Sequence, residues 1–325
     1  MKQTRVLHVG EGPTALSALR SLSARFTIIG VVRNPADAAT DPVCQLAASL
    51  GAPVFGRRTA KEIGDLVAEI QPDIVVISSY DKVLGGDIIS RCRFVNVHYS
   101  PLPRYRGRAN VNWAIINGEP AAWVSVHLVA PGLDAGNVLF QEGTPIGPDD
   151  NAVTVYDRLN DIQERALGEA VERFLSGDTG TPQDQAAATY TCTRNPEDGD
   201  VDWSRTTAEV DRLIRGLPPA YPAYTYLDGE PLELLRATIP SGAPVFEGRV
   251  PGRIAARSLK EGWVDVLTAD GTVRLWEVRR PGQAPVAPAT LIRSVRVTLG
   301  ISKQDLLRRI DKLEKMIALM GVPAV

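Results

Sequence analysis

The sequence predicts an α/β protein: a Rossmann-like N-terminal domain with a mainly parallel sheet, then a small OB-like β-barrel domain and a C-terminal helix. Short runs rich in Val and Ile alternate with helical patterns in the first half of the chain, which is typical of βαβ units. Later the pattern changes to short strands separated by Gly and Pro turns, which indicates a small barrel or sandwich. We therefore expect domains at residues 1–200 and 201–300, and a helix at 301–325.

The apolar pattern places the elements of the first domain. Helical patterns at 13–24 and 60–70 lie between the early strands. A longer helix follows Asn151, with apolar residues near helical spacing as far as Phe174, and the turn-forming sequence after Leu175 ends it. The expected strands are 5–10, 26–32, 73–78, 94–98 and 124–129.

In the second domain, turn and capping signals are the clearest features. Thr206 followed by Glu209 has capping-box spacing and predicts a short helix to about Gly216. The sequence "ADGT" at 269–272, flanked by apolar alternation, predicts a β-hairpin.

The last segment of the chain has apolar residues in alternating three- and four-residue steps, which predicts a helix. The spacing leaves two interpretations open: a helix docked on its own protein, or a short coiled coil that joins two copies into a homodimer. Three heptads are marginal for a free coiled coil. The apolar positions are Leu306, Ile310, Leu313, Ile317 and Met320.

Composition favours a soluble globular protein. The chain has 325 residues, of which 44% are hydrophobic and 23% charged. The longest apolar runs fall well short of the ~20 residues of a membrane helix, and the N-terminus lacks the pattern of a signal peptide. Three well-separated cysteines predict neither a disulfide framework nor a metal cluster. We expect a cytoplasmic protein without metal, and a net charge of −2 gives no general attraction to nucleic acid or membrane.

Polar side chains at the end of an expected strand mark a candidate site. Side chains alternate faces along a strand, so Asn96 and His98 share one face. Pro101 follows shortly and stops the strand, which places the pair at the rim where open α/β sheets bind ligands. The alternative is that His98 only caps the strand. His8 and His127 lie within apolar strands and are expected to be core histidines.

Asp134, on a glycine-containing loop after the next strand, is a third candidate. A carboxylate near an imidazole favours the protonated ring and fixes its tautomer, which suits a general acid or base. Alone, such an aspartate is usually a turn residue. A dinucleotide-binding loop at Gly10-x-Gly12 is a weaker hypothesis, because the third glycine of that motif is missing.

Two segments together resemble a known family. "VNVHYSPLPRYRGRANVNWAIINGE" and "VSVHLVAPGLDAGNVL" are similar to the catalytic core of the 10-formyltetrahydrofolate-dependent formyltransferases. That family includes methionyl-tRNA formyltransferase and the enzymes that formylate amino sugars on nucleotide carriers. "TCTRNPEDGDVDWSRTTAEVDRLIRGL" resembles the C-terminal half of its two-domain members. The resemblance covers the chain to about residue 285 and leaves out the C-terminal helix.

The resemblance implies a 10-formyltetrahydrofolate co-substrate and a catalytic set of Asn96, His98 and Asp134. In that reading Asn96 and His98 stabilise the oxyanion of the tetrahedral intermediate, and His98 carries the proton with help from Asp134. A solvated surface role is the alternative for Lys82. The residues implied in folate binding are Lys82, Val83, Leu84, Ala130, Pro131, Gly132, Leu133 and Arg108.

The arginine-rich loop is the candidate acceptor site. The resemblance to the amino-sugar members of the family implies a UDP- or dTDP-linked amino sugar as partner, and arginine forks could bind its phosphate oxygens bidentately. The alternative is that Arg104 and Arg106 brace the loop. We also expect a cis peptide bond between Leu102 and Pro103, on the resemblance. The predicted acceptor-binding residues are Ser100, Arg104, Tyr105 and Arg106.

Some positions depart from the family pattern. Pro101 stands where leucine is usual, Asn110 where proline is common, and Asn137 where aspartate is frequent. These changes bear on the choice of acceptor. The tRNA-specific members carry a basic insertion after the second strand, whereas residues 33–42 here contain one arginine and two aspartates. Formylation of an amino-sugar nucleotide is therefore the leading hypothesis, and nucleic acid is not the expected partner. Methionyl-tRNA formylation, hydrolysis of formyl-folate and noncatalytic binding are the alternatives.

Overall fold

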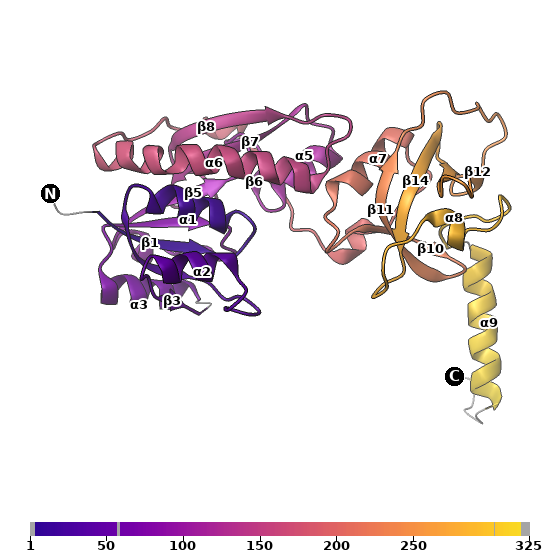
Figure 1. Cartoon of the computed structure of the whole chain (residues 1–325), viewed down its shortest axis with the longest axis horizontal. Helices are drawn as coiled ribbons and strands as arrows, with labels where there is room; N and C mark the ends of the chain where they lie inside the picture. The colour runs from indigo at the N-terminus through magenta and orange to yellow at the C-terminus, as the bar shows by residue number, and fades with distance from the viewer. Residues whose placement is uncertain (1–3, 57–58, 302, 320–325) are drawn as a thin grey trace. The chain divides into compact units, whose positions relative to one another are not determined.

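The computed structural model describes residues 4–56, 59–301 and 303–319, and it divides into two compact units (Figure 1). The first unit comprises residues 1–194 and the second residues 195–325, so the division falls a little before the predicted boundary at residue 200. The first unit is a mainly parallel sheet with helices, and the second contains a separate antiparallel sheet and the C-terminal helix. The predicted fold class is confirmed.

A seven-stranded sheet forms the centre of the first unit, in the order β3-β2-β1-β4-β5-β7-β8. The first five strands of this order pair in parallel, while β7 runs antiparallel to β5 and β8 antiparallel to β7. The strands are β1 (Arg5–Gly10), β2 (Thr27–Val32), β3 (Val54–Phe55), β4 (Ile74–Ser78), β5 (Arg93–His98), β7 (Ala121–Leu128) and β8 (Val138–Pro145).

Helices cover both faces of this sheet (Figure 1). On one face the buried side chains of α1, α2, α5 and α6 share a core with β1, β2, β4, β5 and β7. On the other face α3 and α4 bury Ile63, Leu66 and Ile88 against the opposite side chains of the strands. The helices are α1 (Ala15–Ser23), α2 (Pro42–Ser49), α3 (Ala60–Ile70), α4 (Gly86–Ile89), α5 (Asn110–Ile116) and α6 (Ala152–Leu175).

Local signals explain where the two longest of these helices begin. Thr59 accepts a hydrogen bond from the backbone N–H of Glu62, whose side chain accepts from the N–H of Thr59, so α3 begins with a capping box. Asn151 accepts from the N–H groups of Val153 and Thr154 at the start of α6. Both helices lie where the sequence predicts them.

The second unit holds a five-stranded antiparallel sheet in the order β10-β11-β14-β13-β12. Helix α7 (Thr207–Gly216) begins at the predicted Thr206–Glu209 capping box, and the predicted hairpin joins β13 to β14. None of the helices in the described part of the chain combines the length and the apolar character needed to cross a membrane. The remaining elements are β10 (Ala223–Leu227), β11 (Glu230–Thr238), β12 (Ile254–Arg257), β13 (Val264–Leu267), β14 (Thr272–Arg279), α8 (Pro288–Leu291) and α9 (Lys303–Leu319).

A two-stranded sheet closes the first unit near the end of β5. It pairs β6 (Arg106–Gly107) in parallel with β9 (Tyr190–Thr191). Gly107 has a φ of +112°, and a Cβ on it would lie 2.6 Å from the carbonyl oxygen of Thr191. The close approach of the two backbones therefore requires glycine, and it holds the arginine-rich loop against the segment that ends the unit.

Candidate active site

A cavity of about 550 Å³ opens at the carboxyl ends of β4 and β5. This is the edge at which open α/β sheets bind ligands. Asn96 and His98 line it from β5, and Asp134 lines it from the loop between β7 and β8. All of its lining residues belong to the first unit.

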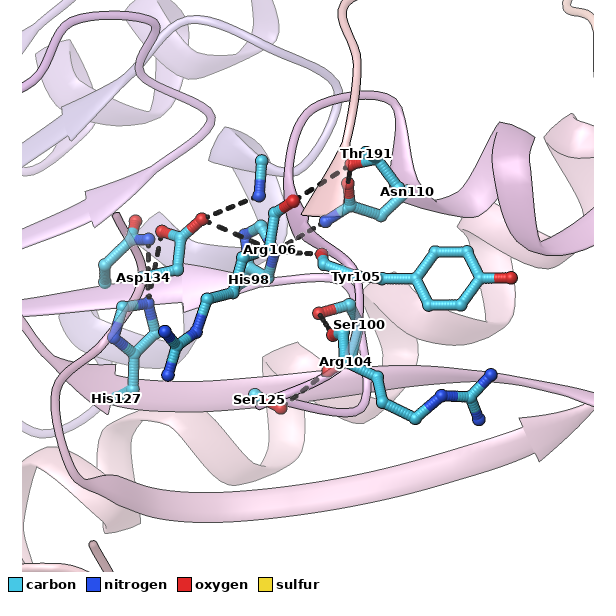
Figure 2. Close-up of polar contacts among 12 residues, drawn as sticks. His98, Ser100, Arg104, Tyr105, Arg106, Asn110, Ser125, His127, Asp134 and Thr191 are labelled. Carbon is cyan, nitrogen blue, oxygen red and sulfur yellow. Dashed lines mark hydrogen bonds and ion pairs between the residues drawn. The ribbon is translucent and has the colours of Figure 1, made fainter. Parts of the chain in front are cut away.

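The carboxylate of Asp134 lies between two imidazole rings (Figure 2). Its Oδ2 is 3.7 Å from His98 Nε2, and its Oδ1 is 3.8 Å from His127 Nε2. The two rings meet edge to face, with centroids 6.2 Å apart. Asn96 joins the group because its Nδ2 donates to His127 Nε2 at 3.0 Å. The structure thus brings the three predicted catalytic residues together around a fourth, His127.

The position of His127 corrects the expectation that it is only a core histidine. Its ring is buried, as predicted, but it lies in the cavity wall and contacts two of the site residues. Burial lowers the pKa of His127 to about 4, against the opposing effect of Asp134. A neutral ring that donates from Nδ1 to the Leu128 carbonyl at 2.9 Å leaves Nε2 as an acceptor. His127 therefore fixes the orientation of the Asn96 amide.

The loop that carries Asp134 is held from several sides. Asp134 has a φ of +49°, and its carboxylate accepts the N–H of Gly107 at 3.0 Å. Gln183 Nε2 donates to the carbonyl oxygens of Asp134 and Gly136, both at 2.7 Å. A Cβ on Gly136 would lie 1.8 Å from the Leu128 carbonyl oxygen, so this position accepts only glycine without a backbone shift.

The side chains of the arginine-rich loop are held by protein partners, and acceptor binding by Arg106 and its neighbours stays a prediction. The guanidinium of Arg106 is buried and donates to Gln183 Oε1 at 2.7 Å and to Gln185 Oε1 at 3.0 Å. Arg104 donates to Glu119 at 2.6 Å, and the Tyr105 hydroxyl donates to the same carboxylate.

Ser100, also predicted to bind the acceptor, donates from Oγ to the Arg104 carbonyl at 3.0 Å. The described residues that line the 550 Å³ cavity do not include Ser100, Arg104, Tyr105 or Arg106. These contacts fit the alternative interpretation, in which Arg104 and Arg106 stabilise the conformation of the loop. The bond between Leu102 and Pro103 is cis, as predicted.

The residues implied in folate binding line the cavity, with one exception. Lys82 pairs with Asp81 at 2.9 Å, and Arg108 donates to the Asp81 carbonyl. Pro131 lies in the same loop as its lining neighbours but is not itself part of the wall. The predicted residues that line the cavity are Lys82, Val83, Leu84, Ala130, Gly132, Leu133 and Arg108.

Sequence reasoning missed four supporting residues: His127, Asn110, Thr191 and Gln183. A usable signal existed for His127, because His98 and His127 both interrupt apolar strands with an imidazole. In the structure β5 and β7 are neighbours, with Asn96 paired opposite His127. Gln183 and Thr191 come from the segment after α6, and the sequence alone carries no mark of their distant partners.

Models of known families match both units of the chain. The formyl transferase family matches residues 14–171, and the formyl transferase C-terminal domain matches residues 194–296. The chain belongs to the formyl transferase family. A methionyl-tRNA formyltransferase of Marinobacter nauticus is 32% identical over 293 residues, which is 86% of this chain and 92% of that protein. A methionyl-tRNA formyltransferase of Roseiflexus castenholzii is 32% identical over 311 residues, or 91% of this chain and 97% of that one.

Solved structures share the fold of this formyltransferase. An N-formyltransferase from Helicobacter canadensis, in complex with folinic acid and dTDP-3-aminofucose, aligns with a TM-score of 0.65 at 19% identity. The alignment covers 84% of this chain and 98% of that one. HypX from Aquifex aeolicus, in complex with tetrahydrofolic acid, aligns with a TM-score of 0.63 at 20% identity, over 89% of this chain and 47% of that one.

Proposed function

We propose that this formyltransferase moves the formyl group of 10-formyltetrahydrofolate to the amine of a nucleotide-linked amino sugar. The observation that carries the proposal is the convergence of Asn96, His98 and Asp134 on one wall of a ligand-sized cavity. Its volume of about 550 Å³ lies within the range of small-molecule and cofactor sites. The resemblance of the sequence to folate-dependent formyltransferases supports the same donor.

The site residues suit each step of such a transfer. The acceptor nitrogen attacks the formyl carbon and forms a C–N bond, and the carbonyl oxygen takes negative charge. The Asn96 amide has two N–H groups; one donates to His127, and the other is available to the oxyanion. The bond between the formyl carbon and the folate nitrogen then breaks.

Proton transfer completes the reaction. The attacking amine loses one proton and the departing folate nitrogen gains one, so the step balances without a metal or a covalent enzyme intermediate. His98 carries this proton, and the Asp134 carboxylate 3.7 Å away stabilises the imidazolium that forms. A general acid–base group of this kind contributes a factor of about 10²–10⁴ to the rate.

The segment after β2 supports a small acceptor. Residues 33–42 contain a single cation, Arg33, whose guanidinium is largely buried and donates to both carboxylate oxygens of Asp41 at 2.8 and 2.7 Å. A surface that binds RNA presents lysine and arginine side chains to phosphates. The cationic side chains that line the cavity are Lys82 and Arg108, which are also among the residues that the resemblance implies for folate binding.

Methionyl-tRNA formylation is the second candidate. Two methionyl-tRNA formyltransferases that are 32% identical over most of this chain favour this candidate. In that case the antiparallel sheet of the second unit would have to contribute RNA contacts.

The test is an acceptor panel with 10-formyltetrahydrofolate as donor, in which a mass increase of one CO reports transfer. The panel contains UDP- and dTDP-linked amino sugars, the same sugars without diphosphate, and charged initiator tRNA. We expect formylation of an amino-sugar nucleotide and a marked loss when the diphosphate is removed. Formylation of the tRNA with no product from any amino sugar would overturn the proposed acceptor.

A further inference from the structure

Asn110, the first residue of α5, contacts the ring of His98 directly. Its side chain is buried and its amide lies 2.5 Å from His98 Nε2 (Figure 2). On its other side the amide meets the hydroxyl of Thr191 at 2.9 Å. None of the steps above uses this residue, although it touches the nitrogen of His98 that faces Asp134.

The surroundings of His98 Nε2 determine which nitrogen of the ring carries hydrogen. The Tyr105 carbonyl oxygen lies 2.9 Å from Nε2, and Asp134 Oδ2 lies 3.7 Å from it. Both are acceptors, so Nε2 must be the donor. Two N–H groups cannot form a hydrogen bond with each other, so the Asn110 amide must present its oxygen to Nε2.

Rotating the Asn110 amide by about 180° gives complementary hydrogen bonds to both His98 and Thr191. Figure 2 draws its nitrogen toward His98, and the two ends of an amide are interchanged by this rotation. In the turned form the Asn110 nitrogen donates to Thr191 Oγ1. The Thr191 hydroxyl in turn donates to the Arg106 carbonyl at 3.2 Å. Each of these contacts then joins a donor to an acceptor.

We propose that Asn110 is a positioning residue whose amide oxygen holds His98 in the Nε2–H tautomer, so that Nδ1 takes the proton from the acceptor amine. The second half rests on the proposed role of His98 in formyl transfer. His98 lines the cavity, and its Nδ1 makes no hydrogen bond to any residue of the described chain. When Nδ1 is protonated, Nε2 keeps its hydrogen, and three oxygen atoms face the resulting cation.

The tautomer can be measured without any substrate. The chain has three histidines, so long-range ¹H–¹⁵N spectra of protein labelled at histidine show three ring systems. The His98→Ala variant identifies the signals of His98. We expect a protonated Nε2 and an unprotonated Nδ1 in the wild type at neutral pH, and a shift toward the other tautomer in Asn110→Leu. An Nδ1–H tautomer in the wild type overturns the proposal, whatever the acceptor is.

Kinetics test whether Asn110 acts through His98. Asn110→Leu should lower kcat about tenfold or more, with little change in the KM for formyl-folate, and it should shift the pH profile of kcat. In the His98→Ala background the same substitution should have no further effect. An equal fall in both backgrounds contradicts the positioning role. Asn117→Ala is the matched control, because it removes a hydrogen bond from the end of the same helix to the Tyr105 hydroxyl.

Helix α9 carries an apolar stripe that faces solvent. Leu306, Ile310, Leu313 and Ile317 follow one another in steps of four, three and four residues, and each is about half exposed. These steps place the isoleucines at heptad positions a and the leucines at positions d. A stripe of this kind on a helix needs a partner surface.

The pattern specifies a second copy of the same helix. Isoleucine at a with leucine at d favours parallel two-stranded coiled coils. In a parallel pair, position g of one helix faces position e of the next heptad in the other. These positions are Arg309 and Glu314, which carry opposite charges. We infer that α9 forms a parallel homodimer through this face. Arg309 also donates to the Gly229 carbonyl at 3.1 Å, which ties α9 to its own unit.

Oligomeric state measured by light scattering tests this inference on the full chain. We expect a concentration-dependent dimer in the wild type and a monomer for Leu313→Glu. Lys312→Ala, one residue away at position c, should remain dimeric. Arg309→Glu should weaken the dimer, and Glu314→Arg added to it should restore it. A wild type that stays monomeric, or a Leu313→Glu variant that stays dimeric, contradicts the inference.

Discussion

His8 predicts a specific pH dependence of stability. The ring is fully buried in β1; its Nδ1 donates to the Val76 carbonyl at 3.2 Å, and its Nε2 has no hydrogen-bond partner among the described residues. A proton added to Nε2 would place an uncompensated charge in the core. Burial therefore lowers the pKa of His8 from 6.5 to about 4.

The sign and size of the effect follow from this lowered pKa. Between these two pKa values the unfolded chain binds more protons than the folded one, so the free energy of unfolding decreases as the pH falls from 6.5 toward 4. For this single group the loss amounts to about 2 kcal/mol at about pH 5, and about 3 kcal/mol once both states are protonated.

Urea unfolding between about pH 7 and about pH 5 measures this loss, with His8→Gln as the comparison. The glutamine amide keeps a donor for the Val76 carbonyl but does not titrate. His127 has a lowered pKa too, and it is present in both proteins, so its contribution cancels in the difference. The free energy of unfolding of the variant should fall by about 2 kcal/mol less than that of the wild type over this range. Equal losses in the two proteins refute the reasoning.

Three further substitutions test the supports of the site and the fold. Gly136→Ala should abolish most of the transferase activity, because its Cβ would meet the Leu128 carbonyl and displace the Asp134 loop; a fully active variant contradicts this. Arg106→Lys should lower kcat more than it raises the KM of the acceptor, because it removes the hydrogen bonds to Gln183. A rise in the KM alone would instead indicate that Arg106 binds the acceptor. Thr206→Ala should lower the free energy of unfolding by about 1 kcal/mol through loss of the capping box, with activity retained, as thermal unfolding would show.

Much of the site could be predicted because it depends on local regularity. The alternation of side chains along a strand is enough to place Asn96 and His98 on one face. The alternation of strands and helices is enough to place that strand in a parallel sheet, with its carboxyl end at the binding edge. The inclusion of Asp134 rests on the resemblance to the formyltransferases, because an aspartate in a glycine-containing loop is usually only a turn residue.

Contacts between residues that are distant in the sequence could not be predicted. An arginine next to a candidate site reads as a ligand for phosphate, but Arg106 is paired with Gln183, which is 77 residues away. His127 reads as a core residue because it lies in an apolar strand, and only the antiparallel pairing of β5 with β7 brings it to Asn96. The direction of the Asn110 amide depends on all the acceptors around one nitrogen. Sequence spacing carries none of this information.

The most direct measurement follows a ¹³C-labelled formyl group from 10-formyltetrahydrofolate in the wild type and in His98→Ala. With an amino-sugar nucleotide as acceptor, the wild type should transfer the label to the sugar nitrogen, as the mass of the product would show. In His98→Ala the label should remain on the folate, with transfer slowed by about 10² or more. Transfer at the wild-type rate by His98→Ala would contradict the central claim that this histidine carries the proton in formyl transfer.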